Sequence, residues 1–151
     1  MTLFEGVKFA HVVSAIVAVG TNLTYGLIMA RSANQPEHER FALGVVKTLD
    51  QRLANPAYGL LLGTGIWMVF ISPYDITDFW ILTALVLYAA AALGGILLYA
   101  PILRRQNDLL ESEGPASPAY RVLANRARGV GIGLTVLVLI IVFLMVTKPT
   151  L

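Results

Sequence analysis

The sequence has 151 residues, of which 57% are hydrophobic and only 13% charged, and this balance excludes an ordinary water-soluble domain, in which about a quarter of the residues are charged. The absence of cysteine excludes disulfides, thiolate metal sites and cysteine nucleophiles. The formal net charge is +2, but the basic residues flank apolar stretches, which favours contact with lipid headgroups and disfavours nucleic acid as a partner. The length predicts one domain over residues 1–151.

Four apolar stretches are long enough to cross a membrane. A hydrocarbon core about 30 Å thick requires roughly 20 apolar helical residues, and only helices or closed barrels satisfy the backbone there. None of the stretches alternates polar and apolar residues as a barrel strand does. The sequence therefore predicts an all-α membrane protein, a four-transmembrane-helix antiparallel bundle, with spans at about residues 4–30, 56–72, 79–103 and 129–147.

The three connections between these spans differ in character. Residues 36–53 carry an apolar stripe at helical spacing, with Arg40 and Lys47 opposite, and predict an interfacial amphipathic helix between spans one and two. In the short acidic connection 73–78, the side chains of Asp75, Thr77 and Asp78 are suited to N-cap the third span, and residues 106–120 predict a polar, turn-rich loop. The apolar stripe consists of Ala42, Val45, Val46, Leu49 and Leu53.

Nine of the eleven lysine and arginine residues lie in the two long connections, and the connection 73–78 has none. Because cytoplasmic loops carry an excess of basic residues, this asymmetry predicts that the long connections are cytoplasmic and that both termini lie outside. The nine residues are Arg31, Arg40, Lys47, Arg52, Arg104, Arg105, Arg121, Arg126 and Arg128.

The first span contains a polar stripe. Lys8, His11, Ser14, Asn22 and Tyr25 fall within about 120° of one another on a helical wheel, so they are expected to face a neighbouring helix. An ionisable group inside a span is costly and indicates function by default. For His11, a structural role as a hydrogen-bond partner of a neighbouring helix is as good an interpretation as a role as a ligand. For Lys8, a structural role is the better interpretation, because its side chain can extend to place the ammonium group among the lipid headgroups.

His11 is the only histidine within a span, since His38 lies in the first long connection. It is therefore the candidate metal ligand, and if it binds a haem iron the second ligand must be a methionine, a lysine, water or a residue of a second subunit. His11 lies on the order of 10 Å below the outer boundary. Met68 and Met145 reach a similar depth, although ordinary packing is their more common role.

The ends of the first and fourth spans suggest a location for the site. Lys8 lies about one turn above His11, and Lys148 follows the fourth span, so an antiparallel bundle places all three at the same side of the membrane. Two neighbouring ammonium groups repel unless an anion offsets them. We therefore predict an outward-opening pocket between spans one and four, lined by Lys8, His11 and Lys148, with Met68 or Met145 on its wall.

Small residues four positions apart predict close helix crossings in the second and third spans. No serine hydrolase triad, paired-carboxylate site or zinc site is apparent in the sequence. The small pairs are Gly59 with Gly63, Ala90 with Gly94 and Ala91 with Gly95.

Several motifs resemble those of a bacterial family of predicted integral membrane proteins, domain of unknown function 2269. The resemblance covers nearly the whole chain and implies a four-span protein of the bacterial cytoplasmic (inner) membrane, without implying an activity. The motifs are Lys8-Phe9-Ala10-His11, the following Ala15 and Gly20, Pro56-Ala57, Thr64-Gly65 and the ending Phe143-Leu144-Met145-Val146-Thr147-Lys148-Pro149.

A more distant resemblance is to the oxygen-independent protoporphyrinogen oxidases of the HemJ type. These are also small four-span proteins with Lys-x-x-His in the first span and a Val-x-Lys-Pro-like ending, which Lys8, His11, Lys148 and Pro149 match. The resemblance implies haem b binding by His11 and functional roles for the two lysines. Copper-resistance membrane proteins open with a similar histidine pattern, but this chain offers few copper ligands.

Two functions are compatible with these features. The first is a haem b-associated or tetrapyrrole-associated redox protein, in which His11 is an axial ligand and Lys8 and Lys148 attract carboxylates. The second is a non-catalytic structural or assembly subunit of a membrane complex, whose polar stripe binds a partner helix or a lipid. The expected partners are membrane lipid, a tetrapyrrole in the first case, and a partner membrane subunit or another copy of the chain. A small transporter is disfavoured because no broken helix or inverted repeat is apparent.

Overall fold

The protein is described by a computed structural model that covers residues 2–32 and 35–150, and the regular structure of this part of the chain is entirely helical. In chain order the elements are α1 (Leu3–Ser32), the 3₁₀ turn η1 (Pro36–His38), α2 (Glu39–Leu49), the π-helical η2 (Asp50–Ala54), α3 (Asn55–Ile71), α4 (Phe79–Gly94), the π-helical η3 (Gly95–Tyr99), α5 (Ala100–Ser112) and α6 (Pro118–Thr147).

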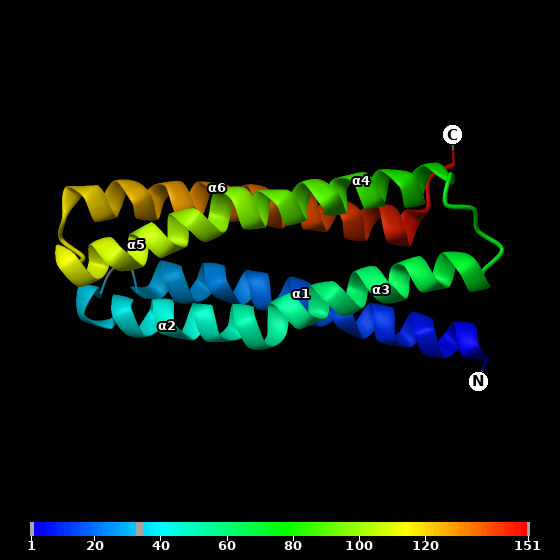
Figure 1. The fold of residues 1–151 in the computed structure, drawn as a ribbon, viewed down its shortest axis with the longest axis horizontal. Helices are drawn as coiled ribbons and strands as arrows, with labels where there is room; N and C mark the ends of the chain where they lie inside the picture. The colour runs from blue at the N-terminus through cyan, green and yellow to red at the C-terminus, as the bar shows by residue number, and fades with distance from the viewer. Residues whose placement is uncertain (1, 33–34, 151) are drawn as a thin grey trace.

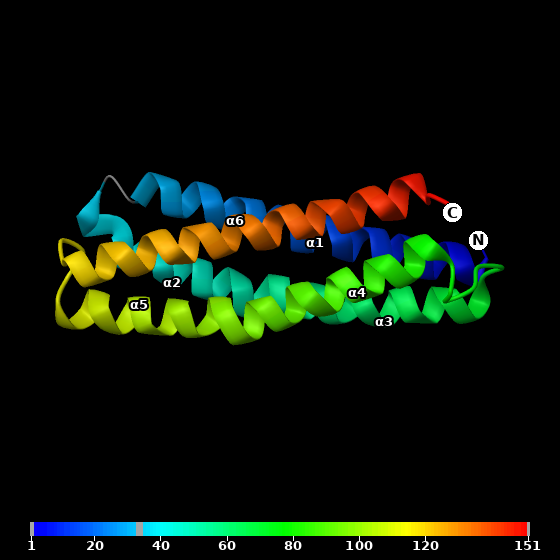
Figure 2. The same ribbon diagram turned by 90° about the horizontal axis from the view of Figure 1, so that it is seen from above.

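These elements form four long rods that lie side by side and run alternately up and down (Figures 1 and 2). The rods are α1, the continuous helix Glu39–Ile71, the continuous helix Phe79–Ser112 and α6, and each contains a stretch apolar enough to cross a membrane. At 1.5 Å per residue a rod of 30 residues is about 45 Å long, which exceeds the hydrocarbon core by several turns. The predicted four-span antiparallel bundle is confirmed.

The amphipathic segment before the second span does not form a separate helix. α2 continues through η2 into α3 and lies along the bundle beside α1 (Figure 1). Ala42, Leu43 and Val46 are buried, and α2 packs on α1 and α5. The prediction of an interfacial helix is therefore not confirmed, because the apolar stripe of this segment contacts other helices of the bundle.

The predicted polar loop over residues 106–120 is largely helical. α5 extends to Ser112 and α6 begins at Pro118, so only residues 113–117 connect them. Gln106 and Tyr120 are both buried, and the Gln106 amide donates to the Tyr120 hydroxyl at 3.2 Å. This hydrogen bond joins α5 to α6 in the polar region beyond the apolar spans. Gly114 has a φ of +82°, which glycine adopts without the strain of a Cβ, so it can turn the chain after α5.

Both π-helical stretches precede a proline, at Pro56 and at Pro101. Proline has no backbone N–H, so a carbonyl of the preceding turn loses its usual donor. The hydrogen bonds shift by one residue, as in the Asn55 N–H that donates to the Asp50 carbonyl. At η3 the rod also bends, and α5 leans away from the line of α4 toward α2 (Figure 1).

Close helix crossings occur at only some of the predicted small residues. A Cβ on Gly94 would lie 3.0 Å from the Leu134 side chain of α6, so this glycine does permit close packing. A Cβ on Gly59, Gly63 or Gly95 would meet nothing within 4 Å, so the prediction of close crossings at these positions is wrong. The α1 and α3 helices pack most extensively, and α1 joins the η2 region at a buried cluster of Tyr25, Val46 and Ala54.

The start of α1, the end of α6 and the α3–α4 connection share one end of the bundle (Figure 1). In that connection Asp78 is the N-cap residue of α4, but its carboxylate accepts the Asp75 N–H and does not cap the helix. The Thr77 N–H and hydroxyl donate to Asp75, and they hold the pKa of that carboxyl below its ordinary value. The hydrogen bonds to Asp75 therefore stabilise the turn at a pH above the pKa of its carboxyl group, and they weaken as the pH falls through that pKa and the carboxylate is protonated.

Candidate functional site

His11 lies at the contact between α1 and α3. Its Nδ1 atom is 3.1 Å from the Thr64 hydroxyl oxygen, and the Thr64 hydroxyl donates to the Leu60 carbonyl at 2.6 Å. Because the single Thr64 proton is used in that bond, the oxygen can only accept from His11. The neutral imidazole therefore carries its proton on Nδ1 and keeps a free lone pair on Nε2.

Gly65 brings the His11 ring close to the backbone of α3. A Cβ at this position would lie 3.1 Å from His11 Cε1, which is closer than ordinary contact, and 3.5 Å from Nδ1. The pair Thr64-Gly65 thus has two complementary roles, since Thr64 supplies the acceptor and Gly65 leaves room for the ring. The importance of Thr64 and Gly65 for this site was not apparent from the sequence, although the two residues belong to the family motifs.

Three other residues of the polar stripe, Ser14, Asn22 and Tyr25, also face the interior of the bundle, whereas Lys8 is exposed. The Asn22 amide donates to the Tyr58 hydroxyl of α3, and Tyr25 is buried in the cluster with Ala54. The Tyr88 hydroxyl donates to the Tyr58 carbonyl at 2.8 Å and so connects α4 to α3. The prediction that this side of α1 faces a neighbouring helix is confirmed for His11, Asn22 and Tyr25.

Lys148 directly follows α6, at the end of the bundle that α6 shares with the start of α1. It caps α6 in the left-handed conformation, with a φ of 44°. Its ammonium group donates to the Tyr74 hydroxyl at 2.7 Å and lies 4.3 Å from the Tyr74 ring centroid and 5.2 Å from that of Trp80. The two rings meet edge to face, so they form an aromatic platform for the cation. This platform was not predicted from the sequence.

The remaining predicted site residues have other surroundings. Lys8 is exposed, and Met68 and Met145 are partly buried. The contacts described for His11 are with α3, whereas those of Lys148 are with Tyr74 and Trp80 near the start of α4. Lys8, His11 and Lys148 are thus not joined by the contacts described here, and their shared pocket stays a prediction.

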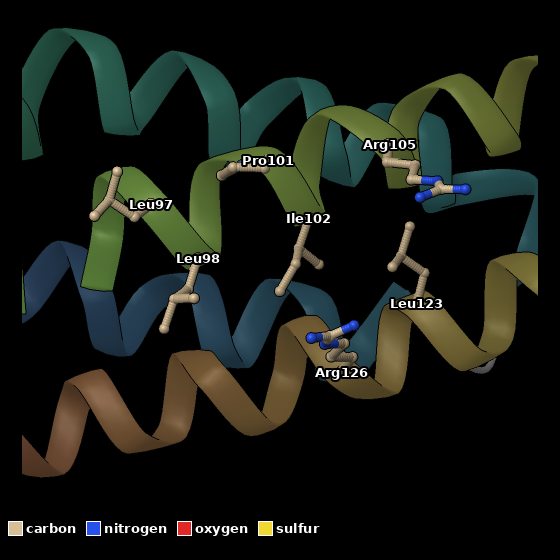
Figure 3. Close-up of a pocket in the computed structure, with 7 residues that line it drawn as sticks. All are labelled: Leu97, Leu98, Pro101, Ile102, Arg105, Leu123 and Arg126. Carbon is tan, nitrogen blue, oxygen red and sulfur yellow. The ribbon is translucent and has the colours of Figure 1, made fainter. Parts of the chain in front are cut away.

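Two surface hollows lie away from His11. One, of about 310 Å³, runs between α1 and the α2–η2 region and is lined in part by Gly20, Thr24 and Leu53. The other, of about 230 Å³, lies between η3–α5 and α6 and has Arg105 and Arg126 in its lining (Figure 3). In the described part of the chain no cluster of three or more His, Cys, Asp or Glu side chains is arranged to hold a metal ion.

The comparisons with known proteins agree with this architecture. A family model described as "Predicted integral membrane protein (DUF2269)" matches residues 5–149, which is nearly the whole chain. No curated protein and no solved structure gives a match. The family match confirms the principal resemblance drawn from the motifs, and with the four apolar rods it identifies an integral membrane protein.

Proposed function

The chain belongs to the family of predicted integral membrane proteins of domain of unknown function 2269, and from this premise we propose that it is a haem b-associated or tetrapyrrole-associated redox protein. The single observation that carries the proposal is the hydrogen bond between His11 and Thr64. Histidines that bind a metal commonly donate their other ring N–H to a fixed acceptor, which sets the tautomer and the ring orientation. Thr64 is such an acceptor within a span.

The available donors fit a haem iron with one imidazole ligand from this chain. Haem b held by histidine cycles between ferric and ferrous iron and can therefore carry one electron. His11 is the ligand in this proposal, and Thr64 orients it. A second ligand to the iron would come from Met68, Met145 or the His11 of a second copy. Lys8 and Lys148 attract the propionates, and Lys148 has two further N–H donors besides the one used on Tyr74.

We expect protein purified in mild detergent, from cells able to make haem, to show a Soret absorption band that His11→Ala reduces by more than half. His38→Ala is the matched control, because His38 is the other histidine of the chain and lies outside the spans. Thr64→Val is expected to weaken haem affinity roughly 10-fold or more, since losing a hydrogen-bond partner of a metal ligand commonly costs about 10- to 100-fold. Thr64→Ser keeps the acceptor and should retain affinity. Absorption spectroscopy and haem titration provide the readouts.

A clean preparation that is colourless and takes up no added haem contradicts the proposal. So does a Soret band that His11→Ala leaves unchanged. Retention of the helical circular dichroism spectrum by each variant separates loss of the ligand from loss of the fold.

The second candidate function is a non-catalytic structural or assembly subunit. It is favoured by the hydrogen bonds from His11 to Thr64 and from Asn22 to Tyr58, which give polar groups of α1 partners within the chain. The absorption experiment discriminates the two functions, because a structural subunit lacks a Soret band and keeps its fold and assembly when His11 is altered conservatively to Gln.

The proposed location is the bacterial cytoplasmic membrane, with both termini outside and the basic end of the bundle in the cytoplasm. Because the chain has no cysteine, a single introduced cysteine can report which side of the membrane its position faces. We expect an impermeant thiol reagent added to intact spheroplasts to label Thr150→Cys and to leave Ser112→Cys unlabelled until the membrane is permeabilised. Both positions are exposed in the folded chain. The reverse pattern of labelling contradicts this orientation.

A further inference from the structure

The hollow between η3–α5 and α6 combines apolar walls with two arginines (Figure 3). Leu97, Leu98 and Ile102 form much of one wall and Leu123 contributes from α6. At η3 the rod bends and α5 leans away from the line of α4 (Figure 1), and the hollow is lined by residues of both η3 and α5. The hollow therefore lies at the π-helical stretch that precedes Pro101.

The two arginines come from different helices, Arg105 from α5 and Arg126 from α6 (Figure 3). Both are exposed, and no carboxylate lies within ion-pair distance of either in the part of the chain that the structure describes. Each guanidinium group keeps its donors for a ligand, and an arginine is suited to bind phosphate oxygens in a bidentate manner.

The depth of the hollow is that of a lipid headgroup. Arg105 lies 26 residues after Phe79, the first residue of α4, a helical rise of roughly 39 Å, and Arg126 lies 21 residues before Thr147, the last of α6, roughly 32 Å. Measured from these helix ends, a hydrocarbon core about 30 Å thick ends close to Arg126 and about 9 Å before Arg105, while Leu97 and Leu98 lie within it.

From the charge and this depth, we propose that the hollow binds an anionic phospholipid, with its phosphate between Arg105 and Arg126 and the start of an acyl chain along the apolar wall. A volume of about 230 Å³ is below the range of roughly 300–1,000 Å³ that encloses small-molecule ligands, but it suits a lipid of which only the headgroup junction is held. Basic hollows between spanning helices are typical sites of anionic headgroups. This site does not depend on haem binding.

Native mass spectrometry of the detergent-purified protein, with phosphatidylglycerol or phosphatidylcholine of identical acyl chains added, tests the proposal. We expect phosphatidylglycerol to bind preferentially and the double variant Arg105→Gln with Arg126→Gln to weaken that binding on the order of ten-fold. The matched control, Arg104→Gln with Arg121→Gln, removes the same charge from the same two helices outside the hollow and should bind as the parent protein does. Ile102→Trp places a larger side chain in the hollow, where the acyl chain is proposed to lie, and should also reduce binding.

Equal binding of the two lipids overturns the proposal. An equal loss in both double variants also overturns it, because the attraction is then a property of the whole basic end. Undiminished binding by Ile102→Trp shows a headgroup held on the surface alone and rejects the acyl-chain position. All four substitutions at arginine are at exposed positions, and circular dichroism of each variant checks that the bundle is intact.

Discussion

Replacing Ala54 by leucine is expected to lower the free energy of unfolding by about 1–3 kcal/mol. Ala54 is 0% exposed and packs with Tyr25 and Val46 where α1 meets the η2 region. Three additional carbon atoms there must displace α1 or force a neighbouring side chain out of its preferred rotamer. Equilibrium unfolding in mixed detergent micelles, followed by circular dichroism, measures the change.

Ala92→Leu is the control for this substitution. Ala92 is exposed on α4, so its larger side chain meets detergent or lipid and leaves the bundle packing unchanged. A change of less than about 0.5 kcal/mol is expected there, as is usual for surface substitutions. Equal effects of the two substitutions would show that Ala54 is not held in a packed interior.

Hydropathy and charge were sufficient to predict the four spans and the grouping of nine basic residues toward one end. The lengths of the rods were not predictable in the same way. The polar second half of α5 remains helical beyond the apolar stretch because Gln106 and Leu110 are buried against other helices. That burial is a tertiary effect, so the spacing of polar residues alone suggested a loop over 106–120.

The amphipathic segment before Pro56 shows a second limit. A stripe of apolar residues at helical spacing indicates a helix with one buried face, but the same pattern suits a membrane surface and a neighbouring helix. α2 buries Leu43 and Val46 within the bundle, so its face is used for packing. The structure distinguishes a helix on the membrane surface from a helix packed in the bundle, because α2 continues through η2 directly into α3.

At the candidate site, the sequence correctly indicated that His11, Asn22 and Tyr25 of α1 face a neighbouring helix, but it did not identify their partners. The partner of His11 depends on the rotation of α3, which places Thr64 and Gly65 at the contact and leaves Gly59 and Gly63 without neighbours. All three glycines lie on the same helix, and spacing alone gave no reason to prefer Gly65. Binding of haem by His11 and of carboxylates by Lys8 and Lys148 stays a prediction.

The hydrogen bond from Asn22 to Tyr58 is expected to couple α1 to α3 inside the bundle. Tyr58→Phe removes the acceptor and leaves the Asn22 amide unsatisfied in a region without water, where an unpaired polar group costs about 1–3 kcal/mol. Asn22→Val removes both the amide and its need for a partner. In the double variant the two effects should therefore not add, and a double-mutant cycle in mixed micelles should give a coupling free energy of about 0.6–1.7 kcal/mol, as for other hydrogen bonds between spanning helices.

Tyr88→Phe provides the comparison for that cycle. The Tyr88 hydroxyl donates to the Tyr58 carbonyl, a backbone group of α3 that can keep a hydrogen bond within its own helix. Its loss leaves no polar group without a partner, so Tyr88→Phe should cost less than Tyr58→Phe and should show no coupling to Asn22→Val. Additive effects of Asn22→Val and Tyr58→Phe would contradict the cycle prediction, because the contact would then contribute nothing to the association of α1 with α3.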